Sequence, residues 1–166
     1  MLSATGVASA TTFLRGDNAW AEAGGGKVLQ VIYASYSTEL STASGTFIDL
    51  GLSADITPSA TDSKIFAHWI ISTRINDDCG YYAKLVRDTT AVYTPATSRD
   101  IYANQSGGET QRIDSRWPTF YLDSPSTTSA TTYKIQVATY GGSTVLFQYD
   151  DGGGLTSQLV LWEIGA

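Results

Sequence analysis

Residues 64–75 have the sequence KIFAHWIISTRI, and this stretch decides the fold. In residues 65–71, bulky apolar side chains occupy both the odd and the even positions. Because side chains alternate between the two faces of a β-strand, this pattern predicts a strand that is covered on both faces. One cover is the core of a β-sandwich. The other is a loop, the N-terminal arm or a neighbouring subunit, and the sequence leaves these three open.

Seven further runs of apolar and β-branched residues, each bounded by Gly, Pro, Asp or Ser, also predict strands. Residues 133–137 alternate apolar and polar side chains, which is typical of a strand with one face in water. Eight strands are enough for two packed sheets, so we predict an all-β sandwich. The predicted strands are residues 28–37, 46–56, 64–75, 80–87, 119–123, 131–140, 143–149 and 158–164.

Residues 1–26 differ in composition from the rest of the chain. They are rich in Ala, Ser, Thr and Gly, contain few large apolar side chains and end in Gly24-Gly25-Gly26. We expect them to form an N-terminal arm with a flexible joint. Residues 27–166 then form the sandwich domain.

Two connections within the sandwich have informative sequences. Tyr140-Gly141-Gly142-Ser143 predicts a tight hairpin, because the glycine pair supplies the positive φ that a primed turn needs. Residues 89–116 have weak strand character and predict the longest loop region.

The charge balance limits the partners of the chain. It has 166 residues and a mass of 17.7 kDa, with 10 Lys and Arg against 16 Asp and Glu, which gives a formal net charge of −6. Binding to nucleic acid or to an anionic membrane requires clustered basic residues, which this sequence lacks. The sequence has no run of 18 apolar residues, so we expect no membrane insertion.

A search for catalytic groups yields few candidates. His68 is the single histidine; it is either a base or ligand, or a partly buried strand residue, and we favour the second. Cys79 is the single cysteine and follows Asp77-Asp78, whose charges raise the pKa of a thiol, so we expect it to be inert. Neither Asp77-Asp78 nor Asp150-Asp151 has the spacing of a calcium-binding loop. We expect no enzymatic activity, no cofactor and no metal.

Aromatic side chains near predicted turns and loops are candidates for contacts with a host surface. Such rings stack on the faces of sugars or anchor contacts between proteins. For each ring, a place in the core or in a subunit contact is the more common alternative. The candidates are Tyr81, Tyr82, Tyr93, Tyr102 and Trp117.

Five blocks of sequence occur in a recognisable order. They are ATTFLRGD at residues 10–17 followed by Trp20, GKVLQV at 26–31, LSADITPS at 52–59 leading to SKI at 63–65, YLDSPSTTSATTYKIQ at 121–136, and WEI at 162–164. In this order the blocks resemble a domain common in structural proteins of cyanobacterial and other marine tailed phages, often labelled tail fibre or virion structural protein. The resemblance spans nearly the whole chain.

The resemblance implies a jelly-roll β-sandwich that assembles as a homotrimer on the exterior of the virion, without catalytic residues. The second apolar face of residues 64–75 supplies candidates for the trimer interface, namely Phe66, His68 and Ile70. The N-terminal arm supplies candidates for attachment to the virion or for interlocking the trimer. These are Phe13, Leu14, Arg15, Asp17 and Trp20.

The expected function is that of a short tail fibre or fibre tip in attachment to the host surface. The expected partners are copies of the chain itself, other virion proteins of the tail or capsid, and a glycan of the host surface. A capsid decoration protein that stabilises the head is the alternative, and a polysaccharide depolymerase is third.

Overall fold

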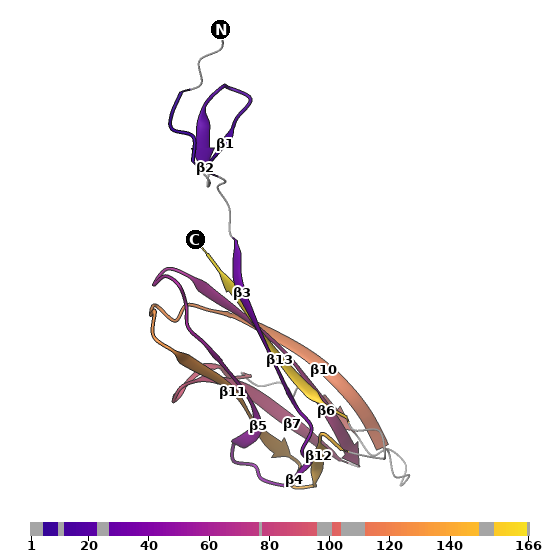
Figure 1. The fold of residues 1–166 in the computed structure, drawn as a ribbon. Coiled ribbons are helices and arrows are strands. Elements are labelled where there is room, and N and C mark those ends of the chain that lie inside the picture. Colours follow the sequence, from indigo (N-terminus) through magenta and orange to yellow (C-terminus); the bar gives the residue numbers. More distant parts are fainter. Residues whose placement is uncertain are drawn as a thin grey trace.

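The computed structural model describes residues 5–9, 12–22, 27–76, 78–95, 101–103, 112–149 and 155–165. Within these ranges, no helix is long and apolar enough to span a membrane. The described residues form strands joined by turns and loops (Figure 1). The strands are β1 (Thr12–Leu14), β2 (Trp20–Glu22), β3 (Val28–Tyr36), β4 (Leu40–Thr42), β5 (Ile48–Ile56), β6 (Lys64–Asn76), β7 (Cys79–Arg87), β8 (Thr90–Tyr93), β9 (Ile101–Ala103), β10 (Arg112–Asp123), β11 (Thr131–Tyr140), β12 (Val145–Phe147) and β13 (Ser157–Ile164).

Most strands belong to two antiparallel sheets. In the first sheet, β13 lies between β3 and β6, and β10 occupies the other edge of β6. Beyond the end of β13, the short strand β12 continues along β6 and pairs with β4 on its far side. In the second sheet, β11 lies between β5 and β7, and β8 and β9 follow one another along the outer edge of β7. The predicted all-β sandwich is confirmed.

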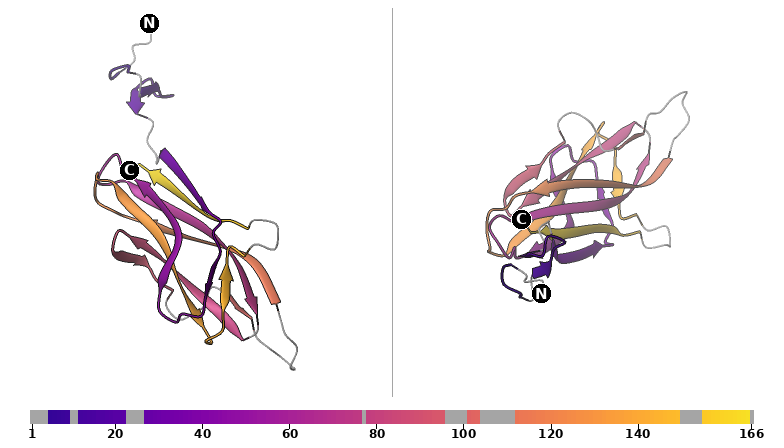
Figure 2. Two further views of the ribbon diagram at one scale, coloured as in Figure 1. Left: turned by 60° about the horizontal axis from the view of Figure 1, so that its bottom comes forward. Right: turned by 90° about the horizontal axis from the view of Figure 1, so that it is seen from above.

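The connections between the sheets give the sandwich its topology. From β5 to β7 the chain alternates between the second and the first sheet, and β10, β11 and β12 alternate again. The principal strands have the orders β3-β13-β6-β10 and β5-β11-β7-β8, which together make a jelly roll of eight strands in two sheets. Figure 2 shows this sandwich from two further sides.

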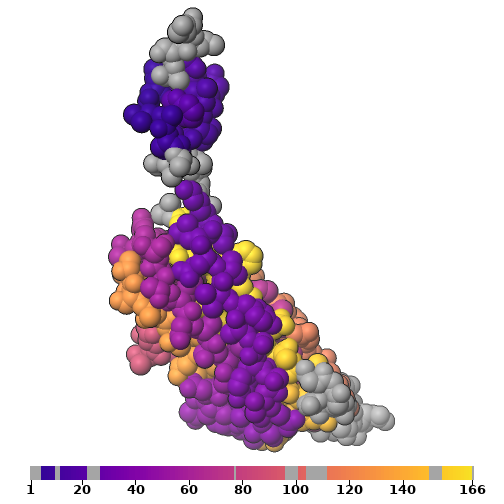
Figure 3. Space-filling view, in the orientation of Figure 1, coloured from indigo at the N-terminus to yellow at the C-terminus, as the bar shows by residue number. Residues whose placement is uncertain are grey.

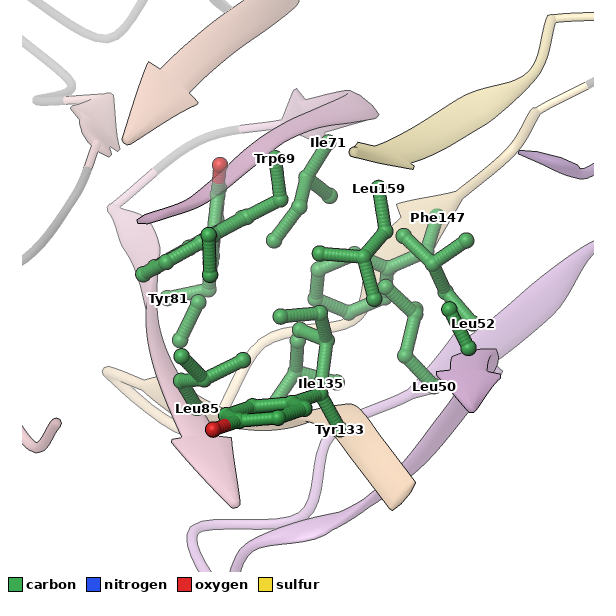
Figure 4. Close-up of a cluster of buried hydrophobic side chains, with 14 of the residues drawn as sticks. Leu50, Leu52, Trp69, Ile71, Tyr81, Leu85, Tyr133, Ile135, Phe147 and Leu159 are labelled. Atoms are coloured by element: carbon green, nitrogen blue, oxygen red, sulfur yellow. The ribbon is translucent and has the colours of Figure 1, made fainter. Parts of the chain in front are cut away.

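The core lies between the sheets and follows the period-two pattern of the strands. On β6 the residues Ile65, Ala67, Trp69 and Ile71 are at most 1 % exposed and face the second sheet. Aromatic rings pack edge to face across the core, with Tyr81 and Phe147 having ring centroids 5.2 Å apart. Figure 4 shows Trp69, Ile71, Tyr81 and Phe147 in the space between the layers, together with Leu50, Leu52, Leu85, Tyr133, Ile135 and Leu159.

The predicted hairpin at Tyr140-Gly141-Gly142-Ser143 is wrong. The strand before this turn, β11, belongs to the second sheet, whereas the strand after it, β12, pairs with β4 and β6 in the first. Both glycines do have positive φ, at 92° for Gly141 and 76° for Gly142. The chain uses this freedom to cross between sheets, because the conformation of a turn does not determine which strand the next segment joins.

The predicted long loop at residues 89–116 is also wrong in part. It contains β8, β9 and the first residues of β10, which starts at Arg112 rather than at residue 119. This early part of β10 is polar, and it becomes a strand because it pairs with β6 along its whole length. The strand β4 was not predicted either, and β12 is shorter than the predicted strand at residues 143–149.

The N-terminal arm contains a hairpin. Strands β1 and β2 pair with Leu14 opposite Trp20, and a backbone hydrogen bond of 2.9 Å from Asn18 N to Arg15 O closes the turn between them. Arg15 Nη2 and Asp17 Oδ2 form an exposed ion pair of 3.0 Å at this turn. Asn18 adopts the left-handed conformation with a φ of 64°. Figures 1 and 3 show this hairpin beyond the end of the sandwich where β3 begins. The triple glycine of the predicted joint lies outside the described residues.

Candidate functional site

The register of the first sheet determines which side chains share its outer surface. Because Ile65, Ala67, Trp69 and Ile71 face the core, the side chains between them on β6 face outward. Each of these lies directly between a residue of β13 and a residue of β10. The rows are Trp162-Phe66-Leu122, Val160-His68-Phe120 and Gln158-Ile70-Pro118, and β3 extends the first two rows with Val31 and Tyr33.

We call this surface the apolar face. Its residues include no Asp, Glu, Lys or Arg, and the nearest charged side chains on β6 and β10 are Lys64 at one end and Arg116 at the other. The rings of Phe66 and Phe120 lie 5.8 Å apart between centroids. The apolar face comprises Val28, Val31, Tyr33, Phe66, His68, Ile70, Pro118, Phe120, Leu122, Val160, Trp162 and Ile164.

The apolar face exposes as much hydrophobic surface as the largest apolar patches on typical monomers. Six of its large side chains are between 38 % and 66 % exposed, with Phe120 the most exposed and Trp162 the least. With full side-chain areas of about 150–250 Å², these six alone expose roughly 600 Å². That value is at the upper limit of the largest apolar patch on a typical monomer. It also approaches the roughly 800 Å² that each partner contributes to a stable interface between proteins.

The outer surface of the second sheet is different in character. Asp49 accepts hydrogen bonds from Lys134 Nζ at 2.9 Å and from Gln136 Nε2 at 2.5 Å, and these two contacts lower the pKa of the Asp49 carboxyl. Thr132 Oγ1 donates to Asp55 Oδ1 at 2.6 Å. Charged and amide side chains therefore cover the part of this surface that β5 and β11 form. Among the described residues, a continuous uncharged and apolar outer surface is found on the first sheet.

Asp123 ties the edge of the apolar face to the second sheet. Its Oδ2 accepts hydrogen bonds from Arg87 Nη1 and from Tyr133 Oη, both at 2.6 Å. Burial and the neighbouring carboxylate raise the pKa of the Tyr133 phenol, so it remains a donor. Asp123 ends β10, directly after Leu122, so this contact fixes the edge strand that carries Phe120 and Leu122.

A second buried carboxylate, Glu163, belongs to β13. Glu163 is fully buried and accepts hydrogen bonds from Ser59 N at 2.7 Å, Ser59 Oγ at 2.6 Å and Gln30 Nε2 at 2.7 Å. Burial alone raises the pKa of a carboxyl, but these hydrogen bonds outweigh it and lower the pKa of Glu163 to about 2. This contact joins β3, β13 and the segment that follows β5, and it serves structure rather than chemistry.

The predicted interface residues Phe66, His68 and Ile70 lie together on the apolar face, and the sequence missed their neighbours on β3, β10 and β13. One signal for the missed residues was present. Residues 28–33 and 120–122 also carry apolar side chains at both odd and even positions. That these strands flank β6 follows only from the pairing of the sheet, which no local pattern contains.

The predicted host-surface residues differ in their exposure. Tyr81 is 1 % exposed in the core, which excludes it as a surface contact. Tyr93 is half-buried, with its ring 5.6 Å from that of Trp69. Trp117 is 48 % exposed. It pairs with Ile71 of β6, so it lies on the opposite side of the first sheet from the apolar face.

Tyr82 and Tyr102 form a surface cluster with Tyr140. Tyr140 was not among the residues predicted to contact the host surface. The ring of Tyr140 lies 6.3 Å from that of Tyr82 and 5.9 Å from that of Tyr102, both edge to face. Gly80 pairs with Tyr140 on one side and Tyr102 on the other, so the rings surround a position without a side chain. The cluster lies where β11 ends, away from the N-terminal hairpin (Figure 1).

The remaining chemical groups give no catalytic arrangement among the described residues. In the described ranges, no group of three or more His, Cys, Asp or Glu side chains is placed to hold a metal ion. Cys79 is buried, and burial raises the pKa of its thiol. The direction agrees with the prediction, but the cause is burial rather than the two neighbouring carboxylates. Asp77, Asp150 and Asp151 lie outside the described residues.

Comparisons with known proteins find a distant structural similarity and no family. No model of a protein family matches the sequence, and no curated protein matches it. The VP2 subviral particle of infectious bursal disease virus has 20 % sequence identity and a TM-score of 0.46, covering 82 % of this chain and 38 % of VP2. T=1 particles derived from the same virus give 19 % identity and a TM-score of 0.46, covering 89 % and 38 % of the two chains. The present chain thus spans about two-fifths of the proteins it resembles.

Proposed function

We propose that this chain is a non-enzymatic structural protein of a phage virion that assembles as a homotrimer through its apolar face. The observation that carries the proposal is the asymmetry of the sandwich. One sheet has an outer surface of charged and amide side chains, whereas the other has an uncharged, apolar outer surface of interface size. An exposed patch of this kind marks a site of protein contact.

A second copy of the chain is the occupant that fits this surface. Each copy carries a net charge of −6, so two copies repel one another wherever their carboxylates approach. The apolar face is the large surface on which this repulsion is weakest. Three copies that close around a threefold axis cover all their apolar faces without leaving one free, which also prevents open-ended association.

The N-terminal hairpin provides a second apolar surface outside the sandwich. Phe13 and Leu14 are each 49 % exposed, and Val7 is 80 % exposed. Trp20 is only partly exposed, because it pairs within the hairpin. This hairpin is the segment through which the trimer binds another virion protein or interlocks its own subunits.

The end of the sandwich away from the hairpin is then the end that meets the host. The cluster of Tyr82, Tyr102 and Tyr140 lies there, and its rings combine an apolar body with a hydroxyl group, as contacts with a surface glycan require. We therefore place the protein on the virion exterior as a short tail fibre or fibre tip. A capsid decoration protein is the second candidate, favoured by the hairpin as a clamp between neighbouring subunits.

Light scattering on the purified protein tests the assembly. A trimer of 17.7 kDa subunits has a mass of about 53 kDa. Phe120→Glu places a charge at the most exposed ring of the apolar face and is expected to give monomers. Ser53→Glu, on the outer side of the second sheet, is the matched control and is expected to leave the trimer intact. A mass of 17.7 kDa for the unmodified protein rejects the proposed assembly.

Labelling intact particles with an antibody distinguishes the two locations. Label on the tail supports a fibre, and label on the head rejects it in favour of capsid decoration. Purified protein that fails to block phage adsorption argues against a role in attachment. Release of sugars from host polysaccharide, abolished by an Asp substitution, overturns the non-enzymatic part of the proposal.

A further inference from the structure

His68 occupies the middle of the apolar face. It lies directly between Val160 of β13 and Phe120 of β10, and Phe66 and Ile70 flank it on its own strand. It is also the only histidine in the chain. A histidine changes its charge near about pH 6.5, within the range that cells and their surroundings reach.

No carboxylate of the described residues faces His68 from the strands beside it. On β13 the outward neighbours are Val160, Trp162 and the uncharged Gln158, and on β10 they are Phe120, Leu122 and Pro118. The charged ends of the face are Lys64 on β6 and Arg116 on β10, and both are cationic. The phenol of Tyr33 on β3 is separated from His68 by the whole width of β13.

Such a position has opposite consequences for the two forms of the imidazole. A neutral imidazole enters an apolar interface at a smaller cost, because it carries no charge and has only one donor and one acceptor nitrogen to lose contact with water. A protonated imidazole must lose its hydration with no anion in reach, which costs far more free energy. In a dissociated subunit the apolar face is in contact with water, so the protonated imidazole keeps its hydration.

We propose that protonation of His68 dissociates the assembly, so that the protein is a trimer at neutral pH and separates into subunits in mild acid. This inference rests on the proposed burial of the apolar face between copies. Each trimer buries three imidazoles, so full exclusion of the charged form lowers the association constant by up to about a thousandfold for each pH unit below the transition.

Light scattering of the full chain at about pH 8 and about pH 5 tests this inference. The unmodified protein is expected to change from about 53 kDa to 17.7 kDa. His68→Gln cannot take up a proton, so its mass is expected to be the same at both pH values. His68→Phe serves as a second variant if the glutamine weakens association at neutral pH. Circular dichroism at each pH verifies that the subunits remain folded.

The outcomes separate this inference from the proposed function. A trimer at both pH values overturns the acid response and leaves the trimer standing. Equal dissociation of the unmodified protein and both variants also overturns the inference, because another group is then responsible. A monomer at both pH values rejects the trimer and the inference together. Loss of the sheet signal in acid rejects the inference in favour of unfolding.

Discussion

Glu163 is expected to make the folding stability of the protein depend on pH below about 4.5. Its carboxyl has an ordinary pKa of 4.5 and a pKa of about 2 in the folded protein. A lowered pKa in the folded state means that the stabilisation is complete above pH 4.5 and is lost as the pH falls through about 2. The pKa difference corresponds to at most about 3 kcal/mol, and screening by solvent around Ser59 reduces the expected value to about 2 kcal/mol.

Urea unfolding at a series of pH values measures this contribution. Glu163→Gln keeps the shape of the side chain but removes its charge, so we expect its stability to change less between pH 4.5 and about 2 than that of the unmodified protein. Glu39→Gln is the matched control, because Glu39 is exposed. All samples are compared at one protein concentration, since association changes the apparent stability. Equal pH dependence in the unmodified protein and Glu163→Gln refutes the reasoning.

Three further predictions concern the core and its turns. Trp69→Ala is expected to lower the free energy of unfolding by about 3–5 kcal/mol, because it leaves a cavity beneath β6; a loss below about 1 kcal/mol in urea unfolding contradicts this. Cys79 is expected to react with a thiol reagent only after unfolding, since its thiol is buried and its pKa is raised, and rapid labelling of the folded protein would show that reasoning to be wrong. Gly141→Ala is expected to destabilise the sandwich by more than about 1 kcal/mol, because φ is 92° and a Cβ would lie 2.3 Å from the Asp78 carbonyl oxygen; an unchanged melting temperature refutes this.

The strands with strong patterns were predictable from sequence. The segment Thr131–Tyr140 has the predicted bounds, and the core-facing residues of β6 are those that its alternation indicates. Burial of one face imposes a period of two on a strand, so the sequence records it directly. The polar start of β10 has no period-two pattern of apolar residues, because it is a strand only through its pairing with β6.

The candidate site was predictable only along one strand. The double apolar pattern around Trp69 indicated an outer face at Phe66, His68 and Ile70, but its extent depends on residues that lie 33 to 98 positions away in the sequence. Trp162 and Phe120 reach the face because β13 and β10 flank β6. The same limit explains the error at Gly141, where glycine reveals a turn without revealing the sheet that the chain enters next.

The contact of Asp123 with Arg87 and Tyr133 has a consequence for the speed of assembly. It holds the end of β10, with Phe120 and Leu122, in one conformation within the lone subunit. A preorganised surface loses little conformational entropy when it docks, and it needs no rearrangement after the encounter. Subunits that meet are thus already shaped for one another, and their association is expected to be limited by orientation and charge repulsion rather than by folding.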